Sequence, residues 1–371
     1  MDTVRYGIVG TGYFGAEMGR YLTSRDDAAV TVVYDPENAE AVASELGARV
    51  AGSVDELCRA DDVDAVVVAS PNWAHREPVL LAAQAGKQVF CEKPIALSYR
   101  DCADMVEATS RAGVLFMAGH VSNFMAGVRH TKALIADGVV GDVLFCRAVR
   151  TGWEDPQPSV SWKKRRDLSG GHLYHHIHEL DLVQSIMGPA RVATMVGGNV
   201  AHRGSEFGDE DDMLVITLEF DGNRFAAMEY GSAFRWPEHH ILVQGTAGAI
   251  RIDMREVGCE LRTPERTERF LLHRTQEEDA ERRSIQLDRS ADGPIMFGRP
   301  QDRPPLWLRG IIEEELDYFQ ALLKGGEPLA EFAALTDGSA ATAAIATADA
   351  LTLSLQESRK VQVADITSPT R

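Results

Sequence analysis

A glycine-rich turn near the start of the chain restricts the possible folds more than any other stretch. Residues 4–22 read VRYGIVGTGYFGAEMGRYL, a short apolar run followed by glycines and then by an amphipathic segment. Gly10, Gly12 and Gly15 form the pattern G-x-G-x-x-G. In this pattern the first glycine permits a tight turn, the second lets the backbone approach a pyrophosphate, and the third allows close helix–strand packing. The stretch therefore predicts a strand, a turn and a helix whose amino end binds a dinucleotide.

An acidic residue follows at the spacing that is typical of this motif. The run AVTVVYD, residues 29–35, predicts a second strand that ends in Asp35, about 20 residues after the glycines. A carboxylate at this place accepts hydrogen bonds from a ribose 2′-hydroxyl and repels a 2′-phosphate. The sequence therefore favours NAD over NADP.

Strand-like and helix-like segments alternate through the first third of the chain. The apolar runs that predict buried strands are residues 64–70, 88–93 and 114–120, and the predicted helices between them are 75–87 and 98–113. Such alternation is typical of a doubly wound parallel sheet, so we expect an α/β Rossmann domain over residues 1–122. Ligands bind beyond the carboxyl ends of such strands. The residues expected to meet there are Ser70, Asn72, Glu92, Lys93 and His120.

The remaining residues, 123–371, have the pattern of a different, α+β domain. Apolar and polar residues alternate along 142–153, 191–201, 213–220 and 224–234, as in strands with one buried face. Asp221-Gly222-Asn223 predicts a hairpin turn between the last two of these strands. Two helical segments, roughly 309–324 and 333–355, are expected to pack back against the sheet.

Charge and cysteine content argue against several classes of protein. The 371-residue chain has 38 Lys and Arg against 56 Asp and Glu, and its formal net charge of −18 disfavours nucleic acid and anionic membranes as partners. No apolar run approaches the roughly 20 residues of a membrane span. The five scattered cysteines favour reduced thiols, and the first residues lack a secretion-signal pattern, so we expect a cytoplasmic protein.

The motifs together resemble those of the Gfo/Idh/MocA family of sugar and cyclitol oxidoreductases. The matching segments are GIVGTGYFG at 7–15, SPNWAH at 70–75, EKP at 92–94, KALIADGVVGDV at 132–143, SGG at 169–171, HELD at 178–181 and VQGTAGAI at 243–250. The resemblance implies a second domain with an open, largely antiparallel sheet that covers the nicotinamide and forms the sugar pocket. It also implies a homo-oligomer, a dimer or tetramer, paired through the outer face of that sheet.

The resemblance further implies which residues contact the cofactor and the substrate. Lys93 of EKP is expected beside the substrate hydroxyl, where a partly desolvated amine exchanges a proton as hydride moves to or from nicotinamide. The implied cofactor contacts are Gly10, Gly12, Tyr13, Phe14, Gly15, Asp35, Ser70, Asn72, His75, Glu92, Lys93, Trp162 and Arg165. The implied substrate contacts are Lys93, His120, Asn123, Trp153, Lys163, Lys164, Arg166, His175 and His178.

Four histidines crowd the segment SGGHLYHHIHELD, residues 169–181. Inositol-dehydrogenase-like members of the family carry D-x-x-x-H-E-[IL]-D here, and this chain matches from His178 to Asp181 but has Tyr174 at the first position. On a continuous helix, Tyr174, His178 and Asp181 share one face. We then expect His178 to act as acid or base, Asp181 to orient its ring, and Tyr174 to replace a carboxylate with a neutral phenol.

The other histidines permit two interpretations. His172, His176 and Glu179 share a second helical face at a spacing that could bind a divalent metal. The favoured interpretation assigns no metal, because Gly170-Gly171 makes the start of the segment non-helical and imidazoles there can cap a helix or meet the substrate.

A basic run, KKRR at 163–166, stands out in this acidic chain. It could receive an anionic sugar, contact the phosphates of the dinucleotide, or form a solvated loop. The sequence leaves these three possibilities open.

The leading hypothesis for function is an NAD-dependent oxidoreductase that takes hydride from a secondary hydroxyl of a sugar, sugar acid or cyclitol. The alternative is a redox-neutral NAD-dependent glycoside hydrolase or lyase that oxidises, eliminates, adds water and reduces again. That chemistry needs additional bases, which Tyr174, His172, His175 and His176 could supply, and an anionic glycoside would suit the basic run. A third possibility, a non-catalytic dinucleotide-binding regulator, has no need of both Lys93 and His178.

Overall fold

A computed structural model describes residues 3–157, 159–287 and 299–368 of the chain. Its contacts divide the chain into two compact units, Met1–Val121 with Ile295–Thr342, and Ser122–Pro294 with Ala343–Arg371. The first change of unit lies beside the predicted boundary at 122. The return of residues 295–342 to the first unit was not predicted from the sequence.

The first unit contains a parallel six-stranded sheet in the order β3-β2-β1-β4-β5-β6. Its strands are β1 (Val4–Val9), β2 (Ala28–Tyr34), β3 (Arg49–Val50), β4 (Ala65–Val68), β5 (Gln88–Glu92) and β6 (Phe116–Gly119). All four residues of β4 are fully buried, as expected of a strand covered on both faces. The predicted doubly wound α/β fold is confirmed.

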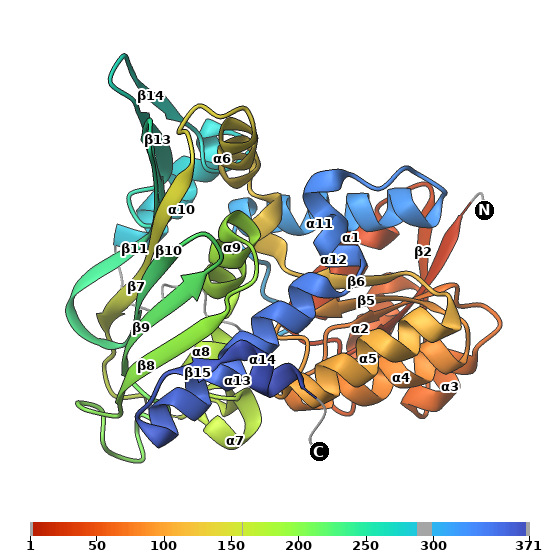
Figure 1. Cartoon of the computed structure of the whole chain (residues 1–371). Helices are drawn as coiled ribbons and strands as arrows, with labels where there is room; N and C mark the ends of the chain where they lie inside the picture. The colour runs from red at the N-terminus through yellow and green to blue at the C-terminus, as the bar shows by residue number, and fades with distance from the viewer. Residues whose placement is uncertain (1–2, 158, 288–298, 369–371) are drawn as a thin grey trace. The chain divides into compact units, whose positions relative to one another are not determined.

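Helices of the first unit fall into two groups. Its α-helices are α1 (Tyr13–Thr23), α2 (Ala39–Leu46), α3 (Val54–Arg59), α4 (Arg76–Gln84), α5 (Tyr99–Ala112), α11 (Leu306–Leu323) and α12 (Ala333–Thr336). Helices α3, α4 and α5 lie side by side, and α1 packs with α2 and α11 (Figure 1). The buried hydroxyl of Tyr6 on β1 donates to Gln320 on α11, and Phe319 packs against the rings of Tyr6 and Phe90. These contacts explain why α11 belongs to the first unit.

The second unit contains a nine-stranded sheet in the order β14-β13-β12-β11-β7-β10-β9-β8-β15. Its strands are β7 (Val143–Trp153), β8 (Val192–Gly198), β9 (Met213–Phe220), β10 (Arg224–Gly231), β11 (Ala233–Gly245), β12 (Ala249–Asp253), β13 (Gly258–Arg262), β14 (Thr267–Phe270) and β15 (Val361–Gln362). The ladders are antiparallel, apart from the parallel pair β10–β7. The predicted hairpin joins β9 to β10, with Gly222 and Asn223 at positive φ.

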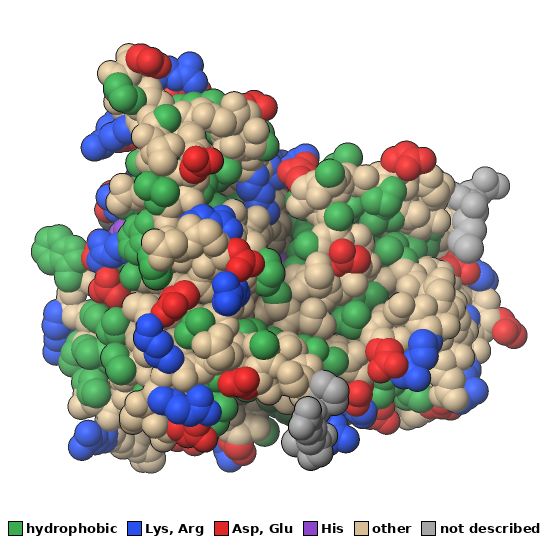
Figure 2. Space-filling model, viewed as in Figure 1, with side chains coloured by type: hydrophobic (Ala, Val, Ile, Leu, Met, Phe, Trp, Pro, Cys, Tyr) green, Lys and Arg blue, Asp and Glu red, His purple; other side chains and the backbone are tan. Residues whose placement is uncertain are grey.

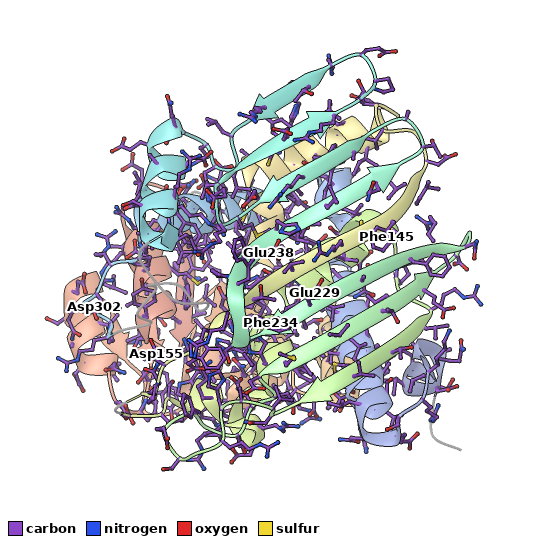
Figure 3. The ribbon with its side chains drawn as sticks, turned by 90° about the vertical axis from the view of Figure 1, so that its left-hand side faces the viewer. Phe145, Asp155, Glu229, Phe234, Glu238 and Asp302 are labelled. Carbon is purple, nitrogen blue, oxygen red and sulfur yellow. The ribbon has the colours of Figure 1, made fainter. Side chains whose placement is uncertain are left out.

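Helices of the second unit are α6 (Ala126–Ala136), α7 (Arg166–Ser169), α8 (His172–His175), α9 (His178–Met187), α10 (Gln276–Leu287), α13 (Ser339–Glu357) and α14 (Val363–Thr367), with the 3₁₀ turns η2 (Val121–Phe124) and η3 (Trp162–Lys164). The predicted helix 333–355 is interrupted, because Gly338 adopts a positive φ of 80° between α12 and α13. Alternate residues of β9, such as Ile216 and Leu218, are buried, while Val215 between the strand's buried positions is exposed. The view in Figure 3 faces the open side of this sheet.

Surface features agree with the charge content of the sequence. Among the described residues, no helix is long and apolar enough to cross a membrane. On the face drawn in Figure 2, the described Lys and Arg side chains are interspersed with Asp and Glu and do not gather in one broad patch.

Candidate active site

The glycine turn has the close approaches that its sequence pattern predicts. Gly10 adopts a φ of +90°, and a Cβ atom on Gly15 would lie 1.9 Å from the carbonyl oxygen of Gly10. Gly12 is the N-cap of α1 and has no side chain to cap the amides of the first turn. A Cβ atom on Gly12 would meet nothing within 4 Å. Strand and helix therefore pack tightly while the helix amino end keeps an open approach for phosphate.

Asp35 lies beside this turn, directly after β2. Its Oδ2 accepts a hydrogen bond of 2.8 Å from the amide of Thr11, and its Oδ1 accepts one of 2.9 Å from the amide of Glu37. These bonds hold the carboxylate next to the glycine turn and the amino end of α1, where phosphate is expected to bind. They leave acceptor capacity on the carboxylate for ribose hydroxyls. The glycines and Asp35 together fit NAD.

His75 holds two of the predicted ligand loops together. Its imidazole is 1% exposed, with Nε2 2.7 Å from the carbonyl oxygen of Ser70 and Nδ1 2.9 Å from that of Pro94. The first carbonyl follows β4 and the second belongs to the Glu92-Lys93-Pro94 loop. The imidazole therefore braces the loop that carries Lys93.

Lys93 has a buried carboxyl as its neighbour. Glu92 is 8% exposed, and its Oε2 accepts a 3.1 Å hydrogen bond from the amide of Lys93. Burial raises the pKa of Glu92 to about 6, against the opposing effects of Lys93 and His120. A carboxyl with a pKa raised in this way is suited to carry a proton. The carboxyl ends of β4, β5 and β6 carry Ser70, Glu92, Lys93 and His120, as the sequence predicts.

The histidine segment of the second unit is not one continuous helix. Helix α8 ends at His175, His176 leaves helical geometry with a ψ of 43°, and α9 begins at His178. The prediction that Tyr174, His178 and Asp181 share one helical face is therefore wrong. No glycine or proline stands at the break to indicate it.

His178 and Asp181 instead share neighbours in the turn η2. Nδ1 of His178 lies 3.2 Å from the hydroxyl oxygen of Ser122. Oδ2 of Asp181 accepts a 2.7 Å hydrogen bond from the side-chain Nδ2 of Asn123. Lys132 in turn donates a 2.6 Å bond to Oδ1 of Asn123. Ser122 and Lys132 were missed in the sequence, although Ser122 directly precedes the predicted substrate residue Asn123.

The phenol of Tyr174 is held by helix α13. Its hydroxyl donates to Asp349 on α13. Burial and the nearby carboxylate raise the pKa of Tyr174 well above its usual value, so the phenol keeps its proton. This contact makes Tyr174 a fixed donor to α13.

Three imidazoles of the segment form a continuous group. The ring centroids of His172 and His176 are 4.5 Å apart, and those of His175 and His176 are also 4.5 Å apart. Among the described residues, no cluster of three or more His, Cys, Asp or Glu is arranged to hold a metal ion. Imidazoles can accept and donate protons near neutral pH.

A lysine and two carboxylates form an ion-pair cluster that reaches His172 at the amino end of this imidazole group. Lys164 lies 3.0 Å from Oε2 of Glu154 and 3.5 Å from Oε2 of Glu210, and Nδ1 of His172 is 4.0 Å from the latter oxygen. Both glutamates are buried. They were not recognised from the sequence, because residues 154 and 210 come from distant segments with no motif around them.

The two arginines of the basic run are also paired with acidic residues. Arg166 pairs with Asp211 at 2.8 Å, and Arg165 lies 3.7 Å from Asp167. The ammonium of Lys163 lies over the ring of Trp162. These local contacts fit a loop that is ordered by its own charges.

Trp153 belongs to an aromatic cluster on β7. The guanidinium of Arg235 stacks 3.4 Å from the centroid of Trp153, whose ring also contacts that of His202. Trp153 follows Thr151 on the face of β7 opposite to Arg150. Its ring therefore lies on the side of the sheet opposite to α9, which Arg150 contacts through Glu179.

Glu179, directly after His178, is buried among polar groups of the sheet. Its Oε1 lies 2.7 Å from Nε2 of His239 and 3.2 Å from Nη1 of Arg150, and its Oε2 accepts a 3.3 Å bond from Tyr230. Burial alone raises the pKa of Glu179, but Arg150 and His239 outweigh it and lower that pKa. Burial, with the nearby Arg150 and Arg282, lowers the pKa of His239 from 6.5 to about 4.

The lowered pKa of His239 predicts a loss of stability in mild acid. Between pH 6.5 and about 4 the unfolded chain binds a proton at this imidazole that the folded chain excludes. The free energy of unfolding is therefore greatest above pH 6.5 and falls by up to about 3 kcal/mol as the pH decreases to 4. Urea unfolding at several pH values measures this loss. His239→Gln should reduce this loss by up to about 3 kcal/mol, whereas His75, His240 and His273, whose pKa values burial also lowers, keep their share of the pH dependence. An unchanged pH dependence in that variant would contradict the assignment.

Two family models match the chain. The model described as "Oxidoreductase family, NAD-binding Rossmann fold" covers residues 4–120, and "Oxidoreductase family, C-terminal alpha/beta domain" covers residues 132–363. The chain belongs to the Gfo/Idh/MocA oxidoreductase family. Its cofactor is NAD, as the glycine turn and Asp35 predict, and the proposed resemblance is confirmed.

Several curated proteins of the Gfo/Idh/MocA family are similar over the whole chain. A 2,7-anhydro-N-acetylneuraminate hydratase from Mediterraneibacter gnavus is 55% identical over 99% of this chain and 98% of its own. A hydratase of the same name from Escherichia coli is 50% identical over 98% of each chain. Both are sugar-processing enzymes, and their name matches the redox-neutral alternative of the sequence analysis.

Solved structures of the family share the fold. The aldose-aldose oxidoreductase from Caulobacter crescentus has a TM-score of 0.74 and 22% identity, covering 97% of this chain and 99% of its own. The prediction of an NAD-binding Rossmann domain followed by an α+β domain with an open, largely antiparallel sheet is thereby confirmed.

Proposed function

We propose that this enzyme hydrates 2,7-anhydro-N-acetylneuraminate, or a closely similar anhydro sugar acid, by a redox-neutral cycle with bound NAD. Two full-length relatives at 55% and 50% identity carry that name. The observation in the structure that carries the proposal is the group of three imidazoles, His172, His175 and His176, in the segment that leads to His178. Alcohol oxidation needs one base, whereas elimination and hydration need further proton carriers.

The substrate's connectivity determines which carbon has to be oxidised. A 2,7-anhydro bridge joins C2 to the oxygen on C7, and C2 carries no hydrogen. Breaking the C2–O7 bond by elimination requires loss of a proton from C3. That proton becomes acidic when C4 is a ketone, so the hydroxyl on C4 is the group to oxidise.

The first half of the cycle opens the bridge. NAD, held by the glycine turn and Asp35, would supply the hydride acceptor for C4 and the hydride donor that restores the alcohol. The amine of Lys93 takes the proton of the C4 hydroxyl, with Glu92 as a neighbouring proton carrier. An imidazole of the histidine segment removes the C3 proton, the C2–O7 bond breaks, and a protonated imidazole, which we assign to His178, delivers a proton to O7.

The second half adds water to the resulting enone. A histidine of the second unit deprotonates the water, whose oxygen bonds to C2 while C3 receives a proton. Hydride returns to C4, and Lys93 gives its proton back to the C4 oxygen. The sum is the addition of one water to the anhydro sugar, with no net oxidation or reduction.

Deuterium labelling tests this cycle. Purified enzyme with 2,7-anhydro-N-acetylneuraminate in D₂O should form N-acetylneuraminate with deuterium on C3 and the original hydrogen on C4. Removing NAD should stop turnover, and substoichiometric NAD should restore it without accumulation of NADH. Accumulation of NADH in proportion to product would instead show a simple sugar dehydrogenase, and product without deuterium on C3 would exclude the elimination.

We also propose that the enzyme is a homo-oligomer that pairs through the open face of its nine-stranded sheet. Phe145 on β7 and Glu229 on β10 lie on this face (Figure 3). Val196, Val215 and Phe225 expose 59%, 43% and 43% of their surfaces. Exposed apolar side chains in such number are typical of an interface between subunits.

The five buried cysteine thiols favour a cytoplasmic location.

A further inference from the structure

We propose that Glu179 is a positioning residue, which Arg150, Tyr230 and His239 hold so that the adjacent His178 keeps one orientation. The inference rests on the acid/base role proposed for His178. Glu179 is 1% exposed, so its side chain, which lies between α9 and the sheet, acts on His178 through the helix and not by contact with substrate.

The partners of Glu179 form one row across the centre of the sheet. Strands β11, β7 and β10 are neighbours in the sheet order. Arg150 of β7 pairs in register with His239 of β11 and with Tyr230 of β10. Three adjacent strands therefore each present one polar side chain at the same level, and the carboxylate of Glu179 contacts all three. Such a row fixes both the depth and the rotation of α9.

The row holds one side of the first turn of α9, and η2 holds another. Successive helical residues are about 100° apart, so His178 and Asp181 lie about 60° apart on one side while Glu179 points away from them. His178 and Asp181 contact Ser122 and Asn123 of η2. The first turn of α9 is thus held on one side by the sheet and on another by η2. These contacts prevent the turn from rotating.

The N-cap of α9 adds no support to these two sets of contacts. This residue, Ile177, supplies no side-chain hydrogen bond to the first turn. A buried carboxylate is costly unless it is fully paired, and Glu179 is paired with a guanidinium, an imidazole and a phenol. Loss of one donor leaves charge unsatisfied in the interior, so the helix start has to move.

The test compares two variants of the row with a control at the other end of the same helix. Glu179→Gln removes the charge, and Tyr230→Phe removes one donor with little change in shape. The control is Thr347→Val, because Thr347 of α13 donates a 2.9 Å bond to Oε1 of Gln184 near the end of α9. All three variants disturb a buried hydrogen bond to α9, but only the first two change the contacts of Glu179, the residue next to His178 in the chain.

The first readout is the ¹⁵N NMR signal of the His178 ring, assigned by its absence in His178→Gln. Wild type and Thr347→Val should show one tautomer, whereas Glu179→Gln should show shifted or averaged ring signals and Tyr230→Phe a smaller change. Unaltered His178 signals in Glu179→Gln would overturn the proposal. This readout needs no substrate, so it decides the positioning role even if the anhydro sugar is not turned over.

The second readout is turnover of the anhydro sugar. Glu179→Gln should lower kcat by about 100-fold while KM changes by less than about threefold, because a misplaced acid/base group affects the chemical step more than binding. Tyr230→Phe should lower kcat by about threefold to tenfold, and Thr347→Val by less than about twofold. Equal losses of kcat in the control and in Glu179→Gln, with similar losses of stability, would show a merely structural role. Wild-type inactivity would overturn the proposed function alone.

Discussion

Replacing Lys93 by methionine is expected to lower kcat by about 100-fold to 10,000-fold, because no other amine of the EKP loop can take the proton of the substrate hydroxyl. Methionine keeps most of the length of the lysine side chain, and the glycine turn and Asp35 are untouched, so the affinity for NAD should change by less than about tenfold. Turnover assays and calorimetric titration with NAD measure the two effects separately.

Lys87, at the opposite end of β5 from Lys93, provides the matched control. It directly precedes β5, and its ammonium donates to the carbonyl oxygens of Ala60 and Val63 at 2.9 and 2.7 Å. Lys87→Met should reduce stability by about 1 to 3 kcal/mol and leave kcat within about twofold of wild type. If Lys93→Met retained wild-type turnover while binding NAD, the chemistry proposed for this residue would be refuted.

Alanine at two neighbouring glycines of the turn should give opposite phenotypes. Gly12→Ala places its methyl group in open space, so the protein without NAD should be as stable as wild type. The same methyl group lies where the backbone approaches a pyrophosphate, and we expect affinity for NAD to fall by about 100-fold. Thermal unfolding and titration with NAD distinguish the two effects.

Gly15→Ala, in contrast, should damage the fold itself. Its Cβ atom would lie 1.9 Å from the carbonyl oxygen of Gly10, so α1 would have to move away from β1. Overpacking of this kind costs about 1 to 3 kcal/mol or more, and we expect a lower melting temperature before any NAD is added. Normal NAD affinity in Gly12→Ala, or full stability in Gly15→Ala, would contradict the geometry described for the turn.

The first unit was predicted well from the sequence because its signals are local. Gly10, Gly12 and Gly15 act within six residues of one another, and the buried parallel strands are unbroken apolar runs. Asp35 is found by its spacing alone. The exception is α11, whose attachment through Gln320 to Tyr6 joins residues 314 positions apart and leaves no local pattern.

The site of the second unit was predicted only in part. HELD identified His178, but the break after His176 destroyed the helical periodicity that linked it to Tyr174. The partners of Glu179 come from β7, β10 and β11, which lie 29, 51 and 60 residues away in the chain. Sheet register brings such residues together, and a single sequence does not contain that register.

The interleaving of the two units has a consequence for how the protein is made. A nascent chain has no hydrogen-bond acceptor for the phenol of Tyr6 until Gln320 has left the ribosome. The second unit likewise includes Asp349, the acceptor for Tyr174, near the carboxyl end. Domains that are continuous in sequence finish folding one after another during translation. Here the first unit needs residues up to Thr342 and the second unit needs residues from Ala343 onward, so a premature stop before α11 leaves neither unit whole.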